Sequence, residues 1–236
     1  MPKTSFPILA SVFLVQLVLP CPHGHAQATP AKAAYPAMAP LAQYLSPDEA
    51  SEIALARTAA PAVISNDAEV MVLRRNGYAT VATGKNGFLC LVERSWGKAT
   101  DDPEFWNPKM RAPHCFSAAA ARTFATIYLM KTKLVLAGKS PKEIAAATAA
   151  AFERKELPPL EPGAMAYMMS KQQYLGDKDR DWHPHTMFFF SGDTSRSWKA
   201  DLAESPVMAA NDPEERVTIL FVVADQWSDG SKAASH

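Results

Sequence analysis

Three short segments in the first half of the chain carry the hydrophobic pattern of β-strands. Residues 69–75 and 78–83 flank Asn76-Gly77, a pair that favours the type I′ turn of a β-hairpin. In residues 88–93 both alternating faces are apolar, which is typical of a strand that is covered on each side of its sheet. We therefore expect an antiparallel meander whose third strand lies in the interior.

Helical patterns lie on either side of these strands. Residues 46–49 read Ser-Pro-Asp-Glu, a capping box that predicts a helix ending near residue 59. Apolar residues recur with a helical period over residues 117–136, and a second capping box predicts another helix over residues 140–156. Only a short link separates these last two helices, so we expect them to form a helical hairpin.

The last third of the chain returns to strand patterns. Residues 164–170, 185–190 and 217–224 are short, apolar and bounded by turn residues. A brief helix is expected around residues 197–202. The fold class is therefore α+β, with an antiparallel sheet of about five or six strands on which the helical hairpin and the N-terminal helix pack.

The first residues have the pattern of a secretory signal peptide. Lys3 precedes an apolar run over residues 6–19, and residues 26–28 read Ala-Gln-Ala, the small-x-small pattern of a cleavage site. The run is shorter than the ~20 residues that cross a bilayer. We expect residues 1–28 to be removed, which leaves a periplasmic or secreted protein with no membrane span.

The mature chain divides into a spacer, one domain and a tail. Residues 29–45 are mostly Ala and Pro without a hydrophobic period, which indicates a flexible spacer. We expect residues 46–230 to form a single globular domain and residues 231–236 a flexible tail.

The charge balance bears on partners. Of the 24 Lys and Arg residues only Lys3 leaves with the signal peptide, so 23 remain against 24 Asp and Glu residues. No strongly basic segment occurs, which argues against a nucleic-acid partner. A small molecule or a cell-envelope component is the partner that we expect.

The two cysteines of the mature chain, Cys90 and Cys115, predict a disulfide bond, because an even pair in an exported protein is usually oxidised. Two unpaired thiols are one alternative. A nucleophilic Cys115 beside His114 is another, although adjacent residues on a strand point to opposite faces.

A long irregular segment over residues 95–115 is the candidate for a ligand-binding site. Loops of this length are usually functional or fixed by a crosslink. Trp96, Phe105 and Trp106 would provide flat apolar surface, and Glu93 and the pair His183 and His185 would provide polar contacts. Glu93 could be a general acid or base with a pKa raised by burial, or it could pair with Arg94 or a loop amide. The leading hypothesis is a cleft near this loop that binds a small ligand or a cell-envelope component.

The segment Trp182-His183-Pro184-His185 is the candidate for a metal site. On an extended segment His183 and His185 share a face, and Zn²⁺ accepts neutral imidazole. Pro184 cannot donate to a strand ladder, so the pair is expected at the entrance or edge of a strand. The third ligand would be His114, Glu93, Asp181 or Glu161.

This metal site makes a zinc-dependent hydrolase the second hypothesis, and a structural or partner-binding module is the third. The alternative for the two histidines is that both bond to the backbone and serve the fold. The methionines of the strand segments are better explained by core filling than by copper binding. No motif of the common hydrolases or nucleotide-binding proteins occurs, so whether the protein is an enzyme stays open and no catalytic residue is assigned.

Four segments together resemble a family of uncharacterised exported bacterial proteins. The resemblance implies a bacterial source and a single-domain layout over most of residues 46–230. That family has no assigned activity, so the resemblance transfers no catalytic residue. The segments are residues 86–96 (NGFLCLVERSW), 102–108 (DPEFWNP), 161–165 with 167–171 (EPGAM and YMMSK) and 182–185 (WHPH).

Overall fold

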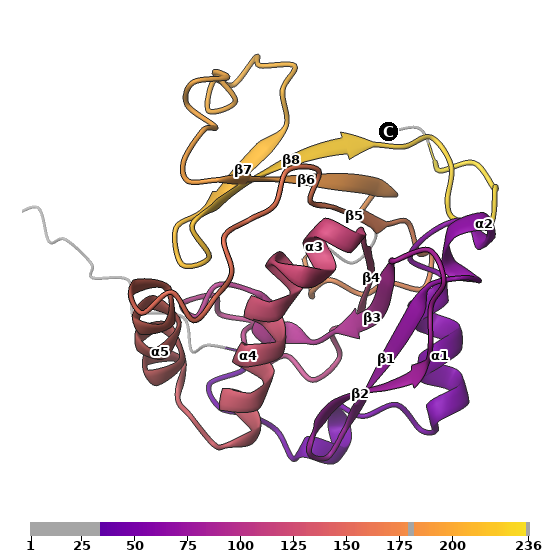
Figure 1. Cartoon of the computed structure of the whole chain (residues 1–236), viewed down its shortest axis with the longest axis vertical. Coiled ribbons are helices and arrows are strands. Elements are labelled where there is room, and N and C mark those ends of the chain that lie inside the picture. Colours follow the sequence, from indigo (N-terminus) through magenta and orange to yellow (C-terminus); the bar gives the residue numbers. More distant parts are fainter. Residues whose placement is uncertain (1–33, 179–181, 235–236) are drawn as a thin grey trace, which may run out of the picture. The chain divides into compact units, whose positions relative to one another are not determined.

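The computed structural model describes residues 34–178 and 182–234, and these build one eight-stranded sheet (Figure 1). The strand order is β2-β1-β3-β4-β5-β6-β8-β7. Neighbouring strands are antiparallel except β1 and β3, which are parallel. The strands are β1 (Glu69–Arg74), β2 (Gly77–Ala82), β3 (Leu89–Glu93), β4 (Ala112–Phe116), β5 (Met165–Met168), β6 (His185–Ser191), β7 (Ala209–Asp212) and β8 (Val217–Val223).

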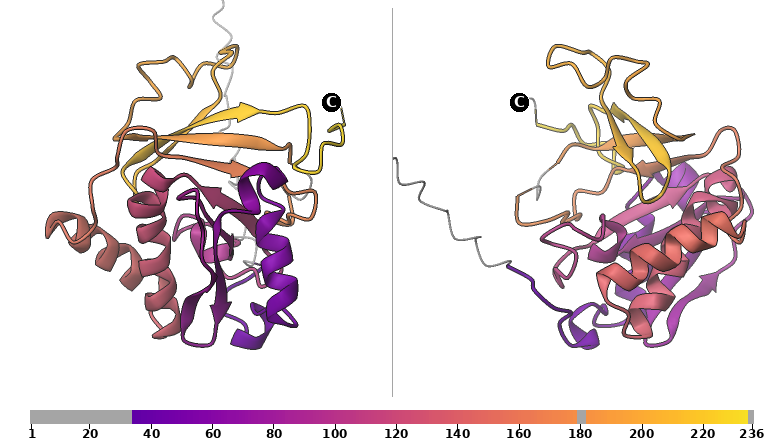
Figure 2. Two further views of the ribbon diagram at one scale, coloured as in Figure 1. Left: turned by 45° about the vertical axis from the view of Figure 1, so that its right-hand side comes forward. Right: turned by 90° about the vertical axis from the view of Figure 1, so that its left-hand side faces the viewer.

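Helices pack on both faces of the first half of the sheet (Figure 2). On one face α1 contacts β1, β3 and β4, while α3 and α4 lie on the other. The helices are α1 (Glu49–Arg57), α2 (Ala62–Ser65), α3 (Ala118–Arg122), α4 (Phe124–Leu136) and α5 (Pro141–Glu153), with short 3₁₀ turns η1 (Leu41–Gln43) and η2 (Ser95–Gly97).

Strand β3 shows why two separate cores form. All five of its residues are buried. Leu89 and Leu91 join the core under α3 and α4, whereas Cys90 and Val92 join the core under α1. Successive side chains on a strand point to opposite faces, so an uninterrupted apolar segment fills both cores. The expected interior position of this strand is confirmed.

The α+β class is confirmed, but the expected count of five or six strands is too low. Strand β4 was hidden because Pro113 argues against an interior strand, and β7 (AAND) carries almost no strand-forming residue. The antiparallel meander is also wrong. Strand β1 pairs with β3 in parallel register, and β2 lies at the sheet edge.

Several local expectations are corrected. The hairpin at Asn76-Gly77 forms, but Gly77 alone has positive φ, so the turn is not type I′. The N-cap of α1 is Asp48, which accepts from the Ser51 amide, rather than Ser46. The expected helix over residues 117–136 is divided at Thr123 into α3 and α4.

Two further helix predictions had opposite outcomes. The segment at residues 197–202 contains turns and no helix. The capping box at Ser140 is confirmed in full, with reciprocal bonds between Ser140 and Glu143. Helix α5 ends at Glu153, three residues earlier than expected.

The disulfide between Cys90 and Cys115 is present. The two residues are in register on β3 and β4, with their Cα atoms 4.0 Å apart. Both side chains lie in the core under α1, away from the face that carries His114. The bridge therefore excludes Cys115 as a nucleophile.

The ends of the domain differ from the expected boundaries. The signal peptide lies outside the described residues, as does the first part of the spacer. From residue 34 onward the spacer packs on the domain: Tyr44 is fully buried and its hydroxyl donates to the Trp106 carbonyl (2.8 Å). The described part of the tail also bonds back, since the Ala233 amide donates to the Asp225 carbonyl (2.8 Å).

Within residues 34–178 and 182–234, none of the helices has the length and apolar character that a membrane crossing requires.

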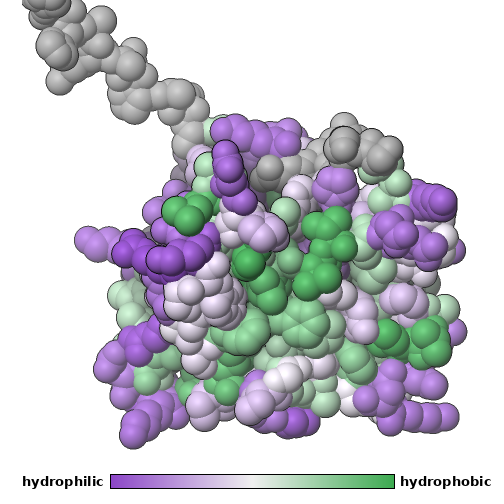
Figure 3. Space-filling view, turned by 90° about the horizontal axis from the view of Figure 1, so that it is seen from above, coloured by the Kyte–Doolittle hydropathy of each residue, from purple (hydrophilic) through white to green (hydrophobic). Residues whose placement is uncertain are grey.

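The outer face of the β6–β8 half of the sheet carries exposed apolar side chains. Phe188 and Phe190 project from β6, and Val222 lies on β8 opposite Thr186. Figure 3 shows apolar side chains gathered on the side of the molecule that is viewed from above. On this face helix α1 packs on β1, β3 and β4 and leaves β6 and β8 uncovered.

Candidate functional site

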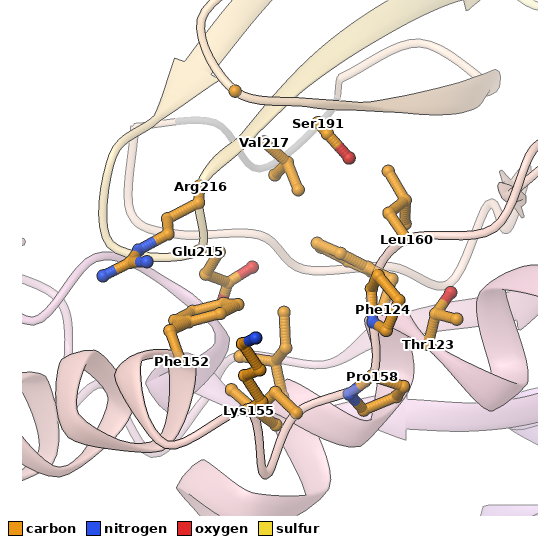
Figure 4. Close-up of a pocket in the computed structure, with 14 residues that line it drawn as sticks. Thr123, Phe124, Phe152, Lys155, Pro158, Leu160, Ser191, Glu215, Arg216 and Val217 are labelled. Carbon is orange, nitrogen blue, oxygen red and sulfur yellow. The ribbon is translucent and has the colours of Figure 1, made fainter.

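A cavity of about 630 Å³ lies between the ends of β6 and β8 and the helices α4 and α5. We call it the α4–β8 cavity. In Figure 4, Ser191 and Val217 lie above it, and Phe152, Lys155 and Pro158 lie below it. Its walls are mostly apolar and include Phe124, Ile127, Phe152, Leu157, Leu160 and Val217.

Local sequence explains how these walls form. Phe124 opens α4 directly after the break at Thr123, and its ring stacks on Phe189 of β6 with centroids 3.9 Å apart. Helix α5 ends at Glu153, Lys155 follows with a positive φ, and Pro158 and Pro159 beyond it line the cavity. A rigid, apolar wall of this kind is typical of a small-molecule site.

Three charged residues line the same cavity. Glu215 is buried, and its carboxylate accepts a hydrogen bond from the Lys131 ammonium (3.1 Å). Arg216 lies over the Phe152 ring at 4.8 Å and pairs with Glu153 (2.6 Å). Lys155 is exposed, and no carboxylate of the described residues lies within ion-pair distance of its ammonium. Of these three residues, Lys155 therefore supplies the one unpaired charge, which is positive.

A second cavity, of about 340 Å³, lies at the other end of β6, on the same face of the sheet as α4. We call it the two-histidine cavity because His114 of β4 and His185 of β6 both line it. Lys98, Trp182 and the methionines Met110, Met168 and Met187 are among its other lining residues.

Strand register brings the two histidines to one face. Cys115 pairs with Tyr167, so one step further along β4 His114 lies opposite Met168. Met168 pairs in turn with His185. Side chains in register on neighbouring strands share a face, so the two imidazoles flank Met168 on the same side of the sheet.

Each imidazole is oriented by a backbone carbonyl two residues earlier. Nδ1 of His114 is 3.1 Å from the Ala112 oxygen, and Nδ1 of His185 is 2.8 Å from the His183 oxygen. A carbonyl only accepts, so in each ring the proton is on Nδ1 and the lone pair is on Nε2. Burial lowers the pKa of each histidine to about 4, so both are neutral at pH 7.

Buried charged groups extend between the two cavities. The Lys131 ammonium donates to Glu215 and also to the backbone carbonyl of Lys98 (3.1 Å), a residue of the two-histidine cavity. Glu93 Oε2 is 3.8 Å from His114 Nδ1. Burial raises the pKa of Glu93 to about 8 and that of Glu215 to about 7, against the opposing effect of the Lys131 charge.

The aromatic residues of the expected ligand cleft lie in the core instead. Trp96 is fully buried and its Nε1–H donates to Thr132 Oγ1 (2.9 Å). Phe105 and Trp106 are buried edge to face, with ring centroids 4.7 Å apart. Large aromatic side chains most often fill cores, and these three line neither cavity described above. The three aromatic residues of the segment 95–115 are therefore packed in the core, whereas Lys98, Met110 and His114 of the same segment line the two-histidine cavity.

The expected His183–His185 pair is only partly supported. His185 lines the two-histidine cavity, whereas His183 precedes β6 and is not among the residues that line it. Pro184 directly precedes the first residue of β6, as expected for the entrance of a strand, but β6 is interior, so Pro184 does not mark a sheet edge. Across residues 34–178 and 182–234, no group of three or more His, Cys, Asp or Glu side chains is placed to hold a metal ion.

Comparison of the chain with protein-family models, curated proteins and solved structures gives no match.

Sequence reasoning missed the residues of the α4–β8 cavity. No sequence motif includes Lys155, Glu215 or Arg216. These residues come close together only because the end of α5 lies near the β7–β8 turn. Lys155 and Arg216 both have positive φ (56° each), a conformation in which Asn or Gly is more usual. Nothing in the sequence pattern marks those two positions.

Proposed function

We propose that this protein is an exported binding domain that holds one small, largely apolar molecule with an anionic end in the α4–β8 cavity. The observation that carries this proposal is a cavity of about 630 Å³ with apolar walls and the unpaired cationic side chain of Lys155. Ligand pockets of soluble proteins usually measure ~300–1,000 Å³ and combine apolar walls with a few polar groups.

The charges at the cavity favour an anionic end group. Glu215 is already neutralised by Lys131, while Lys155 has a free ammonium among the described residues. The Arg216 guanidinium lines the same cavity but is paired with Glu153 (2.6 Å), so Lys155 carries the unpaired positive charge. A carboxylate near Lys155 would gain a charge-assisted hydrogen bond, whereas a cationic ligand would be repelled.

The predicted export of the chain also agrees with the role of an exported binding domain. The predicted signal peptide and the disulfide fit an oxidising compartment. The ligand site is thus proposed in the α4–β8 cavity instead of in a cleft beside residues 95–115. A zinc hydrolase centred on His183 and His185 has less support, because a catalytic zinc needs three protein ligands.

A binding experiment with matched probes tests this proposal. Decanoic acid and decanol have the same apolar chain and differ in charge, and titration calorimetry at pH 7.5 measures each. Decanoate should bind more tightly than decanol because Lys155 contacts only the anion. Lys155→Gln should reduce this preference, while Lys142→Gln, an exposed lysine at the other end of α5, should leave it unchanged.

A second variant tests the cavity itself. Leu160 lies outside helices and strands, so Leu160→Trp fills the cavity with little effect on the sheet. It should abolish binding of both probes while the melting temperature stays near that of the wild type. Failure of wild-type protein to bind either probe, or unchanged binding by Leu160→Trp, would refute the proposal.

A further inference from the structure

The two-histidine cavity combines two imidazoles with three thioethers. Met168 of β5 lies between His114, on the neighbouring strand β4, and His185, on the neighbouring strand β6. Met187 follows His185 by two residues on β6 and so shares its face, and Met110 lines the cavity from the segment before β4. Neighbouring strands are ~4.8 Å apart, so the two histidine backbones are separated by about 10 Å with Met168 in the gap.

The two imidazoles present unused lone pairs. His185 is 1% exposed and His114 is 7% exposed. Nδ1 of each ring bonds to a backbone carbonyl, and no hydrogen bond joins Nε2 of either ring to any residue within 34–178 and 182–234. Neither Nε2 belongs to the fully buried polar atoms of the described residues that lack a partner, so both nitrogens are accessible from the cavity that the two rings line. A carbonyl bond that fixes Nδ1–H and leaves Nε2 free is the usual arrangement of a metal-binding histidine.

We infer that this cavity is a binding site for one soft monovalent cation, Cu(I), held by His114, Met168 and His185. Thioether sulfur is a soft ligand that selects Cu(I), whereas Mg²⁺ and Ca²⁺ require oxygen ligands. Met187 and Met110 stand beside these three residues as further thioether donors.

The charge of the cavity fits a single positive charge better than two. No Asp or Glu lines it, and both imidazoles are neutral donors. The cationic Lys98 also lines it, although its ammonium lies 3.7 Å from both Asp102 and Glu104. A divalent ion such as Zn²⁺ would therefore bring more uncompensated charge into a buried site, without the thiolates or carboxylates that usually offset it.

Core filling is the competing explanation for the methionines. Met168 and Met187 do belong to the hydrophobic core, each 6% exposed. Core filling explains why these side chains are apolar and buried. It does not explain why two imidazoles on one face line a cavity with Nδ1 held by a backbone carbonyl and Nε2 available to a ligand. The two explanations give different results when a metal is added.

Silver titration is the direct test, because Ag(I) is a soft monovalent ion that needs no reductant and leaves the disulfide intact. Any preparation that retains residues 1–28 carries Cys21→Ser, which removes the remaining thiol. One Ag(I) should bind per chain and raise the melting temperature, since a ligand that binds only the folded state stabilises it. Zn²⁺ at the same concentration should produce a much smaller shift.

Two methionine variants locate the ion. Met168→Leu preserves volume and removes the sulfur, and it should weaken Ag(I) binding at least tenfold. Met165→Leu is the matched control: it changes the same strand, but Met165 pairs with Phe188 on the opposite face. In protein labelled with ¹³C at the methionine methyl groups, Ag(I) should shift the Met168 resonance and leave that of Met165 in place.

A histidine pair completes the experiment. His185→Gln should also weaken Ag(I) binding at least tenfold, whereas His183→Gln should not. A melting curve of each metal-free variant shows whether it is folded. If a variant does not fold, the Met168 methyl resonance of the labelled wild-type protein still shows whether Ag(I) binds at this site. The inference is overturned if no Ag(I) binds, if Met168→Leu binds as the wild type does, or if the Met168 methyl resonance does not move.

Cu(I) itself, buffered with a chromogenic chelator under anaerobic conditions, should give the same order among these variants. This site is separate from the α4–β8 cavity, so decanoate binding and Ag(I) binding succeed or fail independently. Loss of one with retention of the other identifies which of the two proposals is wrong.

Discussion

Arg94 and Glu52 form a buried ion pair that joins the end of β3 to α1. The Arg94 Nη2 atom lies 2.7 Å from Glu52 Oε2, and the two side chains are 0% and 2% exposed. The same guanidinium also donates to the backbone carbonyls of Tyr44 and Val92. This pairing leaves Glu93, the neighbour of Arg94, without an arginine partner.

Removing one member of this pair should destabilise the protein strongly. Arg94→Met leaves the Glu52 carboxylate buried without its cation, and the expected loss in the free energy of unfolding is about 3–5 kcal/mol. The control is Arg74→Met. Arg74 pairs with Glu49 at the same distance of 2.7 Å, but both side chains are about half exposed, so the loss should be below ~1 kcal/mol. Urea unfolding measures both, and similar losses would contradict the prediction.

The disulfide should contribute a comparable amount. Replacing Cys90 and Cys115 together by Ala removes a crosslink between positions 25 residues apart. Chain entropy then predicts a loss of roughly 3–4 kcal/mol. Thermal unfolding with and without reductant measures it: reductant should lower the melting temperature of the wild type and leave that of the double variant unchanged. A wild type that is insensitive to reductant while the disulfide is shown to be reduced would be inconsistent with this estimate.

Local rules predicted the elements that depend on a few adjacent residues. The Ser140 capping box, the hairpin at Asn76-Gly77 and the buried strand β3 all depend on short-range patterns, and all three formed. The pairing of Cys90 with Cys115 followed from the cysteine count alone. Where tertiary packing competes with a local rule, as for Pro113 inside β4, the sequence prediction was wrong.

The candidate sites depend on contacts between distant segments, and these could not be predicted. His114 and His185 were both selected from the sequence, but their common cavity requires β5 to lie between β4 and β6. Trp96 was selected as exposed surface, although it packs against Tyr44 from the expected spacer. Strand order and the packing of a terminal segment leave no periodic pattern in the sequence.

Export gives a prediction about the N-terminus. Cleavage at the Ala-Gln-Ala pattern should produce a mature chain that begins at Gln27 or Thr29. Expression in a bacterium, followed by N-terminal sequencing of the periplasmic or secreted fraction, measures this directly. Exported protein that retains Met1, or that carries an acylated Cys21, would contradict the prediction.

Glu93 should make the protein less stable as the pH rises. Burial raises its pKa to about 8, so between roughly pH 4.5 and pH 8 the folded state holds a proton that the unfolded state has lost. The contribution of protonated Glu93 to the free energy of unfolding is complete below the pKa that Glu93 has in the unfolded state. It is lost as the pH rises through the pKa that Glu93 has in the folded state. Glu93→Gln removes the effect, so its free energy of unfolding should rise relative to the wild type between pH 5 and pH 8.5. The exposed Glu204→Gln should show no such trend.

The two buried histidines should act in the opposite direction, on the acid side. Burial lowers the pKa of His114 and of His185 to about 4, below the usual ~6.5. Between these values the unfolded state binds protons that the folded state does not, so stability falls as the pH decreases from 6.5 towards 4. The Glu93 effect has the opposite sign where the two ranges overlap, and a comparison of variants with the wild type separates them.

His114→Gln removes one of the two titrating imidazoles. Its free energy of unfolding should therefore fall less steeply than that of the wild type as the pH decreases from 6.5 to 4, and His114→Gln with His185→Gln should flatten the decline further. Urea unfolding at half-unit pH intervals gives these slopes. Parallel curves for the wild type and both variants would show that folding does not lower the pKa of either imidazole, and would contradict the prediction.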